Sequence, residues 1–327
     1  MRRALLLTLS VLLCLCLFTG CSGYKAIEPD EDDLTVIGTV DGKDVYLEEL
    51  RFVAYTYRDM MTARYGDDIF EGEDKEYYLA MLRELVYANI TADYAVLSLC
   101  AEAGIGLGEP SVLAAVDKRM TKTAKELGGM GKYKKFLKEN HLTDHMLRRS
   151  TEISLLKNEL MYVYVDDILL IEDEDEDIYD IVKNEFISVR HIFIPHSEEN
   201  ARENITEVKS RLDGGESFET LLAEYGKDEE MSAEGLFILE GYMTDEYWSV
   251  ARELSVSERS DVIEDDRGLY IVERLEMNPA SIMLKLDYLK ELYQTYTFYS
   301  IIDERQAALS FVPNDAGTCY MNNPFAK

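Results

Sequence analysis

The hydrophobic pattern of this chain changes twice along its length, and this constrains its fold more than any other feature. Residues 48–164 are patterned almost entirely as helix, with apolar residues at the spacing of one buried face. From 185 to 276, short apolar runs alternate with short helical patterns, and a helical pattern then resumes over 277–312. An apolar helix needs a partner surface, so we expect this last one to pack on the N-terminal helices. The chain is therefore predicted to be α+β: a mostly helical domain with an inserted domain built around a small antiparallel sheet.

The N-terminal domain, placed at 35–170, is expected to begin with a β-hairpin. Val36–Val40 is a short apolar run, Asp41 and Gly42 follow it, and Val45 begins the return strand. Asp-Gly is a turn signal between short strands. Helical patterns then continue as far as Tyr162.

The composition rules out two classes of protein. The chain has 327 residues, of which 47% are hydrophobic, so it can bury a real core and is not disordered throughout. Its formal net charge is -30, from 64 acidic and 34 basic residues. A nucleic-acid binder needs lysine and arginine to neutralise phosphates, so nucleic acid is not expected as a partner.

The first twenty residues have the form of a signal peptide. Arg2 and Arg3 precede an apolar stretch over 4–18, which is short for a membrane span but suits a signal segment. It ends in Phe-Thr-Gly-Cys at 18–21, which resembles a lipobox. The resemblance implies cleavage before Cys21, acylation of Cys21 and an extracytoplasmic, membrane-anchored protein. Residues 21–34 would be the lipidated tether, and the alternative is ordinary secretion with cleavage elsewhere.

Two cysteines, Cys100 and Cys319, would remain besides Cys21. Cys100 lies in an apolar helical run and is expected to be a small buried hydrophobe. A disulfide with Cys319 stays open, because sequence does not give the distance between them.

A run of six acidic residues occupies 172–177. It predicts a solvated linker over 171–184, or the frayed start of a helix. The alternative is a calcium loop, but the alternating ligands, central glycine and distal glutamate of an EF-hand are missing.

Several motifs between 186 and 276 occur in a recognisable order. They are Val-Arg-His-Ile-Phe-Ile at 189–194, Gly-Gly-Glu-Ser-Phe-Glu at 214–219, Leu-Ala-Glu-Tyr-Gly-Lys-Asp at 222–228, Gly-Tyr-Met at 241–243 and Gly-Leu-Tyr-Ile-Val at 268–272. This ordered set resembles a parvulin-type peptidyl-prolyl isomerase. With the helical remainder, the chain resembles the PrsA and SurA class of exported foldases. The implied parvulin-like domain is 185–276, with a C-terminal helix over 277–312 and a tail over 313–327.

The resemblance implies that six residues form the site. His191 matches the first histidine of the parvulin network, and Asp228 matches its acid-or-cysteine position. Leu236, Met243 and Tyr247 match the apolar proline pocket. Tyr270 stands where the family has a second histidine, so the catalytic set is predicted as His191, Asp228 and Tyr270.

Prolyl isomerisation explains why these residue types suffice. Rotation about the peptide bond has a barrier of about 18–20 kcal/mol. An isomerase lowers it by binding the twisted amide better than either planar form, with an apolar pocket and a few polar groups. No cofactor or metal is needed. His141 and His145 are four positions apart, but Thr143 is expected to cap a helix between them. The two histidines are therefore not expected to share a helical face and bind a metal. His196 is expected to be exposed.

Each residue also has a structural interpretation. His191 would otherwise be a core histidine, Asp228 a turn acid, and the three pocket residues ordinary core. The leading prediction is an isomerase and chaperone whose clients are unfolded exported chains with Xaa-Pro bonds. The alternative is a holdase with an inactive parvulin domain, which Tyr270 favours because tyrosine has no second ring nitrogen. A solute-binding lipoprotein fits poorly, because that class has repeated βαβ patterning.

Overall fold

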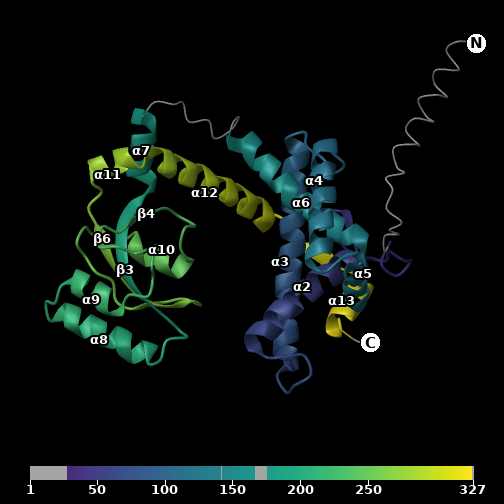
Figure 1. Cartoon of the computed structure of the whole chain (residues 1–327), viewed down its shortest axis with the longest axis horizontal. Coiled ribbons are helices and arrows are strands. Elements are labelled where there is room, and N and C mark those ends of the chain that lie inside the picture. The colour runs from purple at the N-terminus through teal and green to yellow at the C-terminus, as the bar shows by residue number, and fades with distance from the viewer. Residues whose placement is uncertain (1–27, 141, 166–174, 326–327) are drawn as a thin grey trace, which may run out of the picture. The chain divides into compact units, whose positions relative to one another are not determined.

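A computed structural model describes residues 28–140, 142–165 and 175–325 (Figure 1). Contacts divide the chain into two compact units. Unit 1 comprises Met1–Leu156 with Leu309–Lys327, and unit 2 comprises Lys157–Ala308. Each unit combines helices with one small antiparallel sheet, which confirms the α+β class. The predicted signal peptide, Cys21 and the first part of the tether lie outside the described residues.

The helices of unit 1 follow the apolar spacing of the sequence. They are α2 (Leu47–Tyr65), α3 (Lys75–Glu102), α4 (Pro110–Glu126), α5 (Met130–Glu139) and α6 (Asp144–Val163), the last of which runs past the unit boundary. Leu82, Val86 and Ile90 bury one face of α3. As predicted, the Thr143 hydroxyl caps α6 by accepting a hydrogen bond from the Met146 amide at 2.9 Å.

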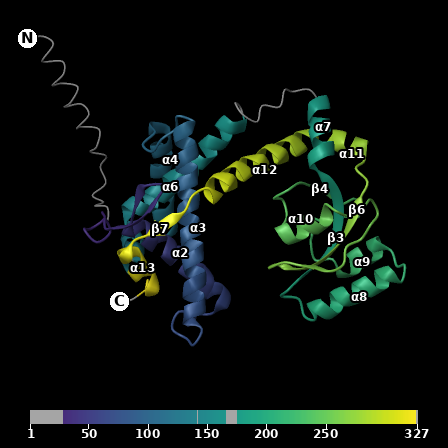
Figure 2. The same ribbon diagram turned by 180° about the vertical axis from the view of Figure 1, so that it is seen from behind.

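The sheet of unit 1 joins the two ends of the chain. Strand β1 (Val36–Val40) pairs with β2 (Lys43–Tyr46) as the predicted hairpin, and on its other edge with β7 (Phe311–Pro313). Helix α13 (Asp315–Asn322) then packs on β1 (Figure 2). Unit 2 is therefore inserted into unit 1, and a strand and a short helix complete unit 1 where a tail was expected.

The sheet of unit 2 has the order β4-β3-β6-β5 and is antiparallel throughout. Its strands are β3 (Ile187–Pro195), β4 (Leu236–Ile238), β5 (Ile263–Glu264) and β6 (Gly268–Leu275). Its helices are α8 (Ala201–Asp213), α9 (Phe218–Tyr225) and α10 (Asp245–Ala251). Helices α8 and α9 cover one face and α10 the other (Figure 1). The sequence pattern did not reveal β4, which has only three residues.

Two predictions about the segments flanking this sheet are wrong. The acidic linker predicted over 171–184 is helical from Asp175, as α7 (Asp175–Glu185). Its apolar residues Ile178 and Val182 recur every four positions and are buried, which outweighs the repulsion between its acids. The helix predicted over 277–312 is two helices, α11 (Pro279–Leu284) and α12 (Leu286–Ala307).

Helices α7, α11 and α12 share one core within unit 2. Ile282, Leu286 and Leu289 pack with Val182 and with Phe237 of β4. The C-terminal helix was expected to belong with the N-terminal helices, but its described contacts group it with unit 2. The N-terminal helices and the core around α7 and β4 both offer apolar surface. Helical periodicity does not specify which of these two surfaces a helix covers.

Both described cysteines are free. Cys100 is buried, as predicted, and burial raises the pKa of its thiol to about 11, whereas Cys319 is exposed. Among the described residues, no helix is both long enough and apolar enough to cross a membrane.

Candidate functional site

Strand β3 places His191 on the face of the sheet that α10 covers. Because side chains alternate along a strand, Val189 and His191 point to this face, while Ile192 and Ile194 point toward α8 and α9. His191 is only 3% exposed. A buried imidazole needs partners for both ring nitrogens, and here both have one.

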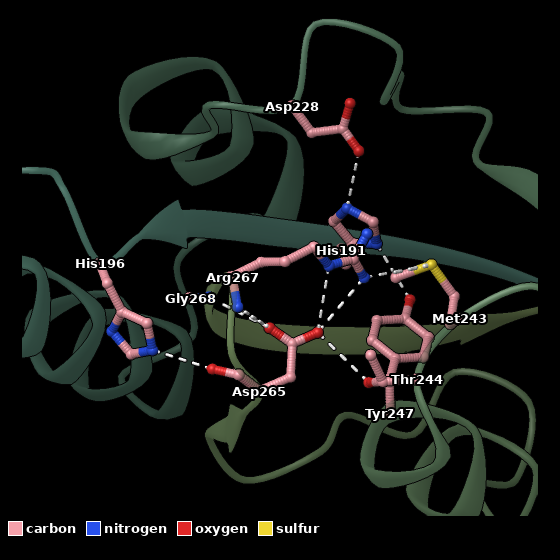
Figure 3. Close-up of polar contacts among 9 residues, drawn as sticks. All are labelled: His191, His196, Asp228, Met243, Thr244, Tyr247, Asp265, Arg267 and Gly268. Atoms are coloured by element: carbon pink, nitrogen blue, oxygen red, sulfur yellow. Dashed lines mark hydrogen bonds and ion pairs between the residues drawn. The ribbon is translucent and has the colours of Figure 1, made fainter. Parts of the chain in front are cut away.

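His191 bridges two other predicted site residues (Figure 3). Its Nε2 lies 3.0 Å from Oδ2 of Asp228, and its Nδ1 lies 3.0 Å from the hydroxyl of Tyr247. The Asp228 carboxylate accepts only, so the ring proton belongs on Nε2. In this neutral tautomer Nδ1 accepts, and the Tyr247 hydroxyl donates to it. The three side chains therefore form a chain of hydrogen bonds from α10 to the loop after α9.

Tyr247 was predicted to belong to the proline pocket and to be a core residue in either case. Its side chain is fully buried. Its ring packs edge-on against His191, with centroids 5.6 Å apart. The hydroxyl of Tyr247 supplies His191 with its second hydrogen-bond partner, which the sequence did not predict.

Tyr270 contacts His191 through its ring. It lies across from Phe193 on β6 and is 2% exposed. Its ring stacks on Phe193 at 4.6 Å and meets the rings of His191 and Tyr247 edge-on at 5.4 Å each. Burial raises the pKa of Tyr270, so its hydroxyl stays protonated. Tyr270 therefore forms an aromatic wall beside the imidazole.

Asp228 is held by the loop that follows α9. Its Oδ1 accepts a hydrogen bond from the Glu230 amide at 3.0 Å, and the adjacent Lys227 amide donates to the Phe193 carbonyl at 3.0 Å. The loop ends at Gly235, where φ is +70° and a Cβ would lie 2.3 Å from the Val189 carbonyl oxygen. Only glycine allows this close approach to β3. The loop thereby fixes the carboxylate beside His191.

The hydrogen bond from His191 lowers the pKa of Asp228 below its ordinary value of 3.8. The ionised carboxylate therefore stabilises the folded state above that value, and this stabilisation is lost as the pH falls through the lowered pKa. We expect Asp228→Asn to reduce the free energy of unfolding of unit 2 most above about pH 5, and progressively less at lower pH. Urea unfolding followed by the fluorescence of Trp248 measures this, because Trp248 is the chain's one tryptophan.

Glu229→Gln is the matched control for this prediction. Glu229 is the exposed neighbour of Asp228, so its amide variant should unfold like the wild type at every pH. A stability gap between Asp228→Asn and wild type that stays constant from neutral to acidic pH would contradict the assignment.

The remaining pocket residues lie at the edge of the same cluster. Leu236 and Met243 are half-buried and pack against the core that contains Tyr247 and Tyr270. Phe193 is also half-buried in this cluster and was not predicted. Together they form a partly exposed apolar surface beside the polar chain.

Asp265 and Arg267, in the turn between β5 and β6, were missed by the sequence analysis. The Asp265 carboxylate is 1% exposed and accepts hydrogen bonds from the Arg267 amide at 2.9 Å and the Gly268 amide at 3.0 Å. It also accepts from the Thr244 hydroxyl at 3.2 Å and from the Arg267 guanidinium at 3.3 Å. Burial opposes ionisation, but these donors outweigh it and lower the pKa of Asp265.

Arg267 is thereby aimed across the site. Its Nη2 lies 3.9 Å from the sulfur of Met243 (Figure 3). Its guanidinium is 5.7 Å from the ring centroid of Tyr270. The side chain is about half exposed, so it is a cation available at the rim. The sequence signal for this arrangement is the run Asp-Asp-Arg-Gly at 265–268, just before β6, because aspartate favours turns.

The other histidines lie elsewhere. His145 is 2.8 Å from the buried Glu48, in unit 1. His196 is exposed, as predicted, and its Nε2 donates to the Asp265 carbonyl at 2.8 Å. His141 is outside the described residues. No group of His, Cys, Asp and Glu side chains within 28–140, 142–165 and 175–325 is arranged to hold a metal ion.

Similarity to known proteins agrees with the motifs. No protein-family model matches the chain. The foldase protein PrsA of Geobacillus kaustophilus (strain HTA426) is 31% identical over 133 residues, which cover 40% of this chain and 44% of that protein. The chain thus matches less than half the length of this curated relative. The match confirms the resemblance to PrsA-like foldases.

Two solved structures are also similar. The peptidylprolyl isomerase PrsA of Bacillus anthracis aligns with a TM-score of 0.33 and 20% identity, over 66% of this chain and 94% of that chain. The parvulin NmPin of Nitrosopumilus maritimus aligns with a TM-score of 0.24 and 25% identity, over 28% of this chain and 97% of that chain.

Proposed function

We propose that this protein is an extracytoplasmic foldase whose second unit isomerises Xaa-Pro bonds in unfolded exported chains. The observation that carries the proposal is the bridge from Asp228 through His191 to Tyr247, beside the half-buried Met243 and Leu236. A bound proline would lie on the apolar residues, and the amide would face the polar chain. No covalent step is required.

The polar chain would act on the twisted amide. As the C–N bond rotates, its double-bond character is lost and charge shifts between the amide atoms. Groups that are already oriented toward this changed charge stabilise it without reorganising. His191 is oriented by two hydrogen bonds and walled by Tyr270. Arg267 adds a fixed positive charge at the rim, held by a fully buried carboxylate.

A lipid anchor at Cys21 completes the proposal. It rests on the apolar segment at 4–18 and the Phe-Thr-Gly-Cys sequence that follows. Metabolic labelling with palmitate tests it, and an unlabelled mature protein would overturn the anchor while leaving the isomerase proposal intact.

A protease-coupled isomerisation assay tests the central proposal. Residues 22–327 are expected to accelerate isomerisation in a panel of Xaa-Pro peptides. A flat trace across the panel would overturn the isomerase. Suppressed aggregation of an unfolded client by the same preparation would then support the second candidate, a holdase. The aromatic wall formed by Tyr270 favours this candidate.

The two site tyrosines should differ in their importance. Tyr247→Phe removes the donor to Nδ1 of His191, and a lost hydrogen bond of about 1.4 kcal/mol corresponds to about a tenfold lower kcat/KM. Tyr270→Phe keeps the ring that packs on His191, so kcat/KM should change by less than about threefold. The same isomerisation assay measures both. The opposite order would place the second polar partner of His191 at Tyr270.

A further inference from the structure

A second hollow lies within unit 2, beside α10. It has a volume of about 990 Å³ and is bounded by the ends of α7 and β4, by α10 and by α12. Residues 247 and 248 are neighbours on α10, yet Tyr247 bonds to His191 whereas Trp248 lines the hollow. The hollow is therefore separate from the candidate isomerase site.

The hollow combines aromatic rings with acidic groups. Trp248, Tyr293, Tyr296 and Tyr299 provide the rings. Its five carboxylates come from α7, the segment after β4, α10 and α12, and are Glu185, Glu240, Asp245, Asp303 and Glu304. Arg252 is the one basic residue among those that line it.

The acidic groups of the hollow are unpaired within 28–140, 142–165 and 175–325. None of the five carboxylates makes an ion pair with any residue that the structure describes. Arg252, which lines the hollow, lies 3.4 Å from Glu253, which does not. The hollow therefore holds a concentrated negative charge that a positively charged ligand would neutralise.

The rings suit the same ligand. An ammonium or guanidinium group is attracted to the face of a tyrosine or tryptophan ring. The protein already shows this chemistry here, because the ammonium of Lys157 lies 4.5 Å from the ring centroid of Tyr299. Three further rings line the hollow together with the carboxylates, those of Trp248, Tyr293 and Tyr296.

We propose that this hollow is a binding site for lysine- and arginine-bearing segments of unfolded polypeptides. Charge complementarity selects this occupant, since nucleic acid and acidic chains would be repelled. A second copy of this protein is a poor occupant too, because its 64 acids outnumber its 34 bases. The site goes beyond the proposed isomerase, because it recognises charge and needs no proline.

The single tryptophan makes a direct test feasible. The protein (residues 22–327) is titrated with a short proline-free peptide of serine, leucine, lysine and arginine, and with a twin in which glutamate replaces each basic residue. We expect a saturable change in Trp248 emission with the basic peptide alone, weakened by added salt. Fluorescence anisotropy of the labelled peptides provides a second readout if the emission of Trp248 does not respond.

Two double variants remove acids from different walls. Asp303→Asn with Glu304→Gln acts on α12, and Glu185→Gln with Glu240→Gln acts on α7 and the segment after β4. Each lost exposed charge should weaken binding roughly two- to threefold, so each pair should raise Kd about fivefold. Glu291→Gln, an exposed acid of α12 that does not line the hollow, is the control and should leave Kd unchanged.

Two results would overturn the site: equal binding of both peptides, or double variants that bind like wild type. Because the probe contains no proline, neither result depends on the isomerase assay. Conversely, loss of isomerase activity with peptide binding retained would remove the proposed catalysis and leave this site standing.

Discussion

Replacing His191 with alanine is expected to lower kcat/KM for an Xaa-Pro peptide about a hundredfold. His191 hydrogen-bonds to both Asp228 and Tyr247, so its loss disconnects the polar chain at its centre. The apolar pocket would remain, because Met243 and Leu236 pack against the tyrosines rather than against the imidazole alone. Peptide binding should therefore weaken much less than the rate. The protease-coupled assay, with kcat and KM separated, measures this.

His145→Ala is the control for this prediction. It removes a histidine that pairs with Glu48 in unit 1 and leaves every described contact of unit 2 unchanged. Its isomerase activity should equal that of the wild type. If His191→Ala retained full activity while remaining folded, His191 would be only a core histidine, and the catalytic assignment would be wrong.

The second large effect is expected on stability. Asp265→Ala should lower the free energy of unfolding of unit 2 by about 3 kcal/mol. The Asp265 carboxylate is buried and satisfies the amides of Arg267 and Gly268 as well as the Thr244 hydroxyl at the start of α10. Alanine would leave the buried Gly268 amide without this acceptor and release the Arg267 guanidinium. Urea unfolding monitored by Trp248, which lies on α10, reports on this region directly.

Asp261→Ala serves as the comparison for Asp265→Ala. The side chain of Asp261 is 97% exposed and lies 3.6 Å from Lys209, so removing it should change stability by less than about 0.5 kcal/mol. Similar unfolding curves for both variants would show that the Asp265 hydrogen bonds do not hold the turn. The Arg267 guanidinium would then lack the fixed position that the proposed site requires.

The candidate site shows how far local sequence information extends. His191 and Asp228 are 37 positions apart, and both were assigned to one site because an ordered set of motifs surrounds them. The partner on the other side of the imidazole was not predicted. A tyrosine at 247 looks like one more apolar core residue in the sequence. Whether its hydroxyl finds a buried nitrogen depends on how α10 lies across β3, and that orientation is a tertiary property.

The same division applies to the fold. By itself, the sequence determined the individual helices of unit 1, the first hairpin, the strand that carries His191 and the existence of an insertion, because periodicity, caps and turns act between near neighbours. Only the tertiary structure decided that the acidic segment after 174 is helical, that β7 and α13 complete unit 1 and that α12 packs with α7. In each of these cases an apolar face had more than one surface to cover. Burying the apolar face against any of these surfaces is favourable. Packing between residues far apart in the chain decides which surface it covers.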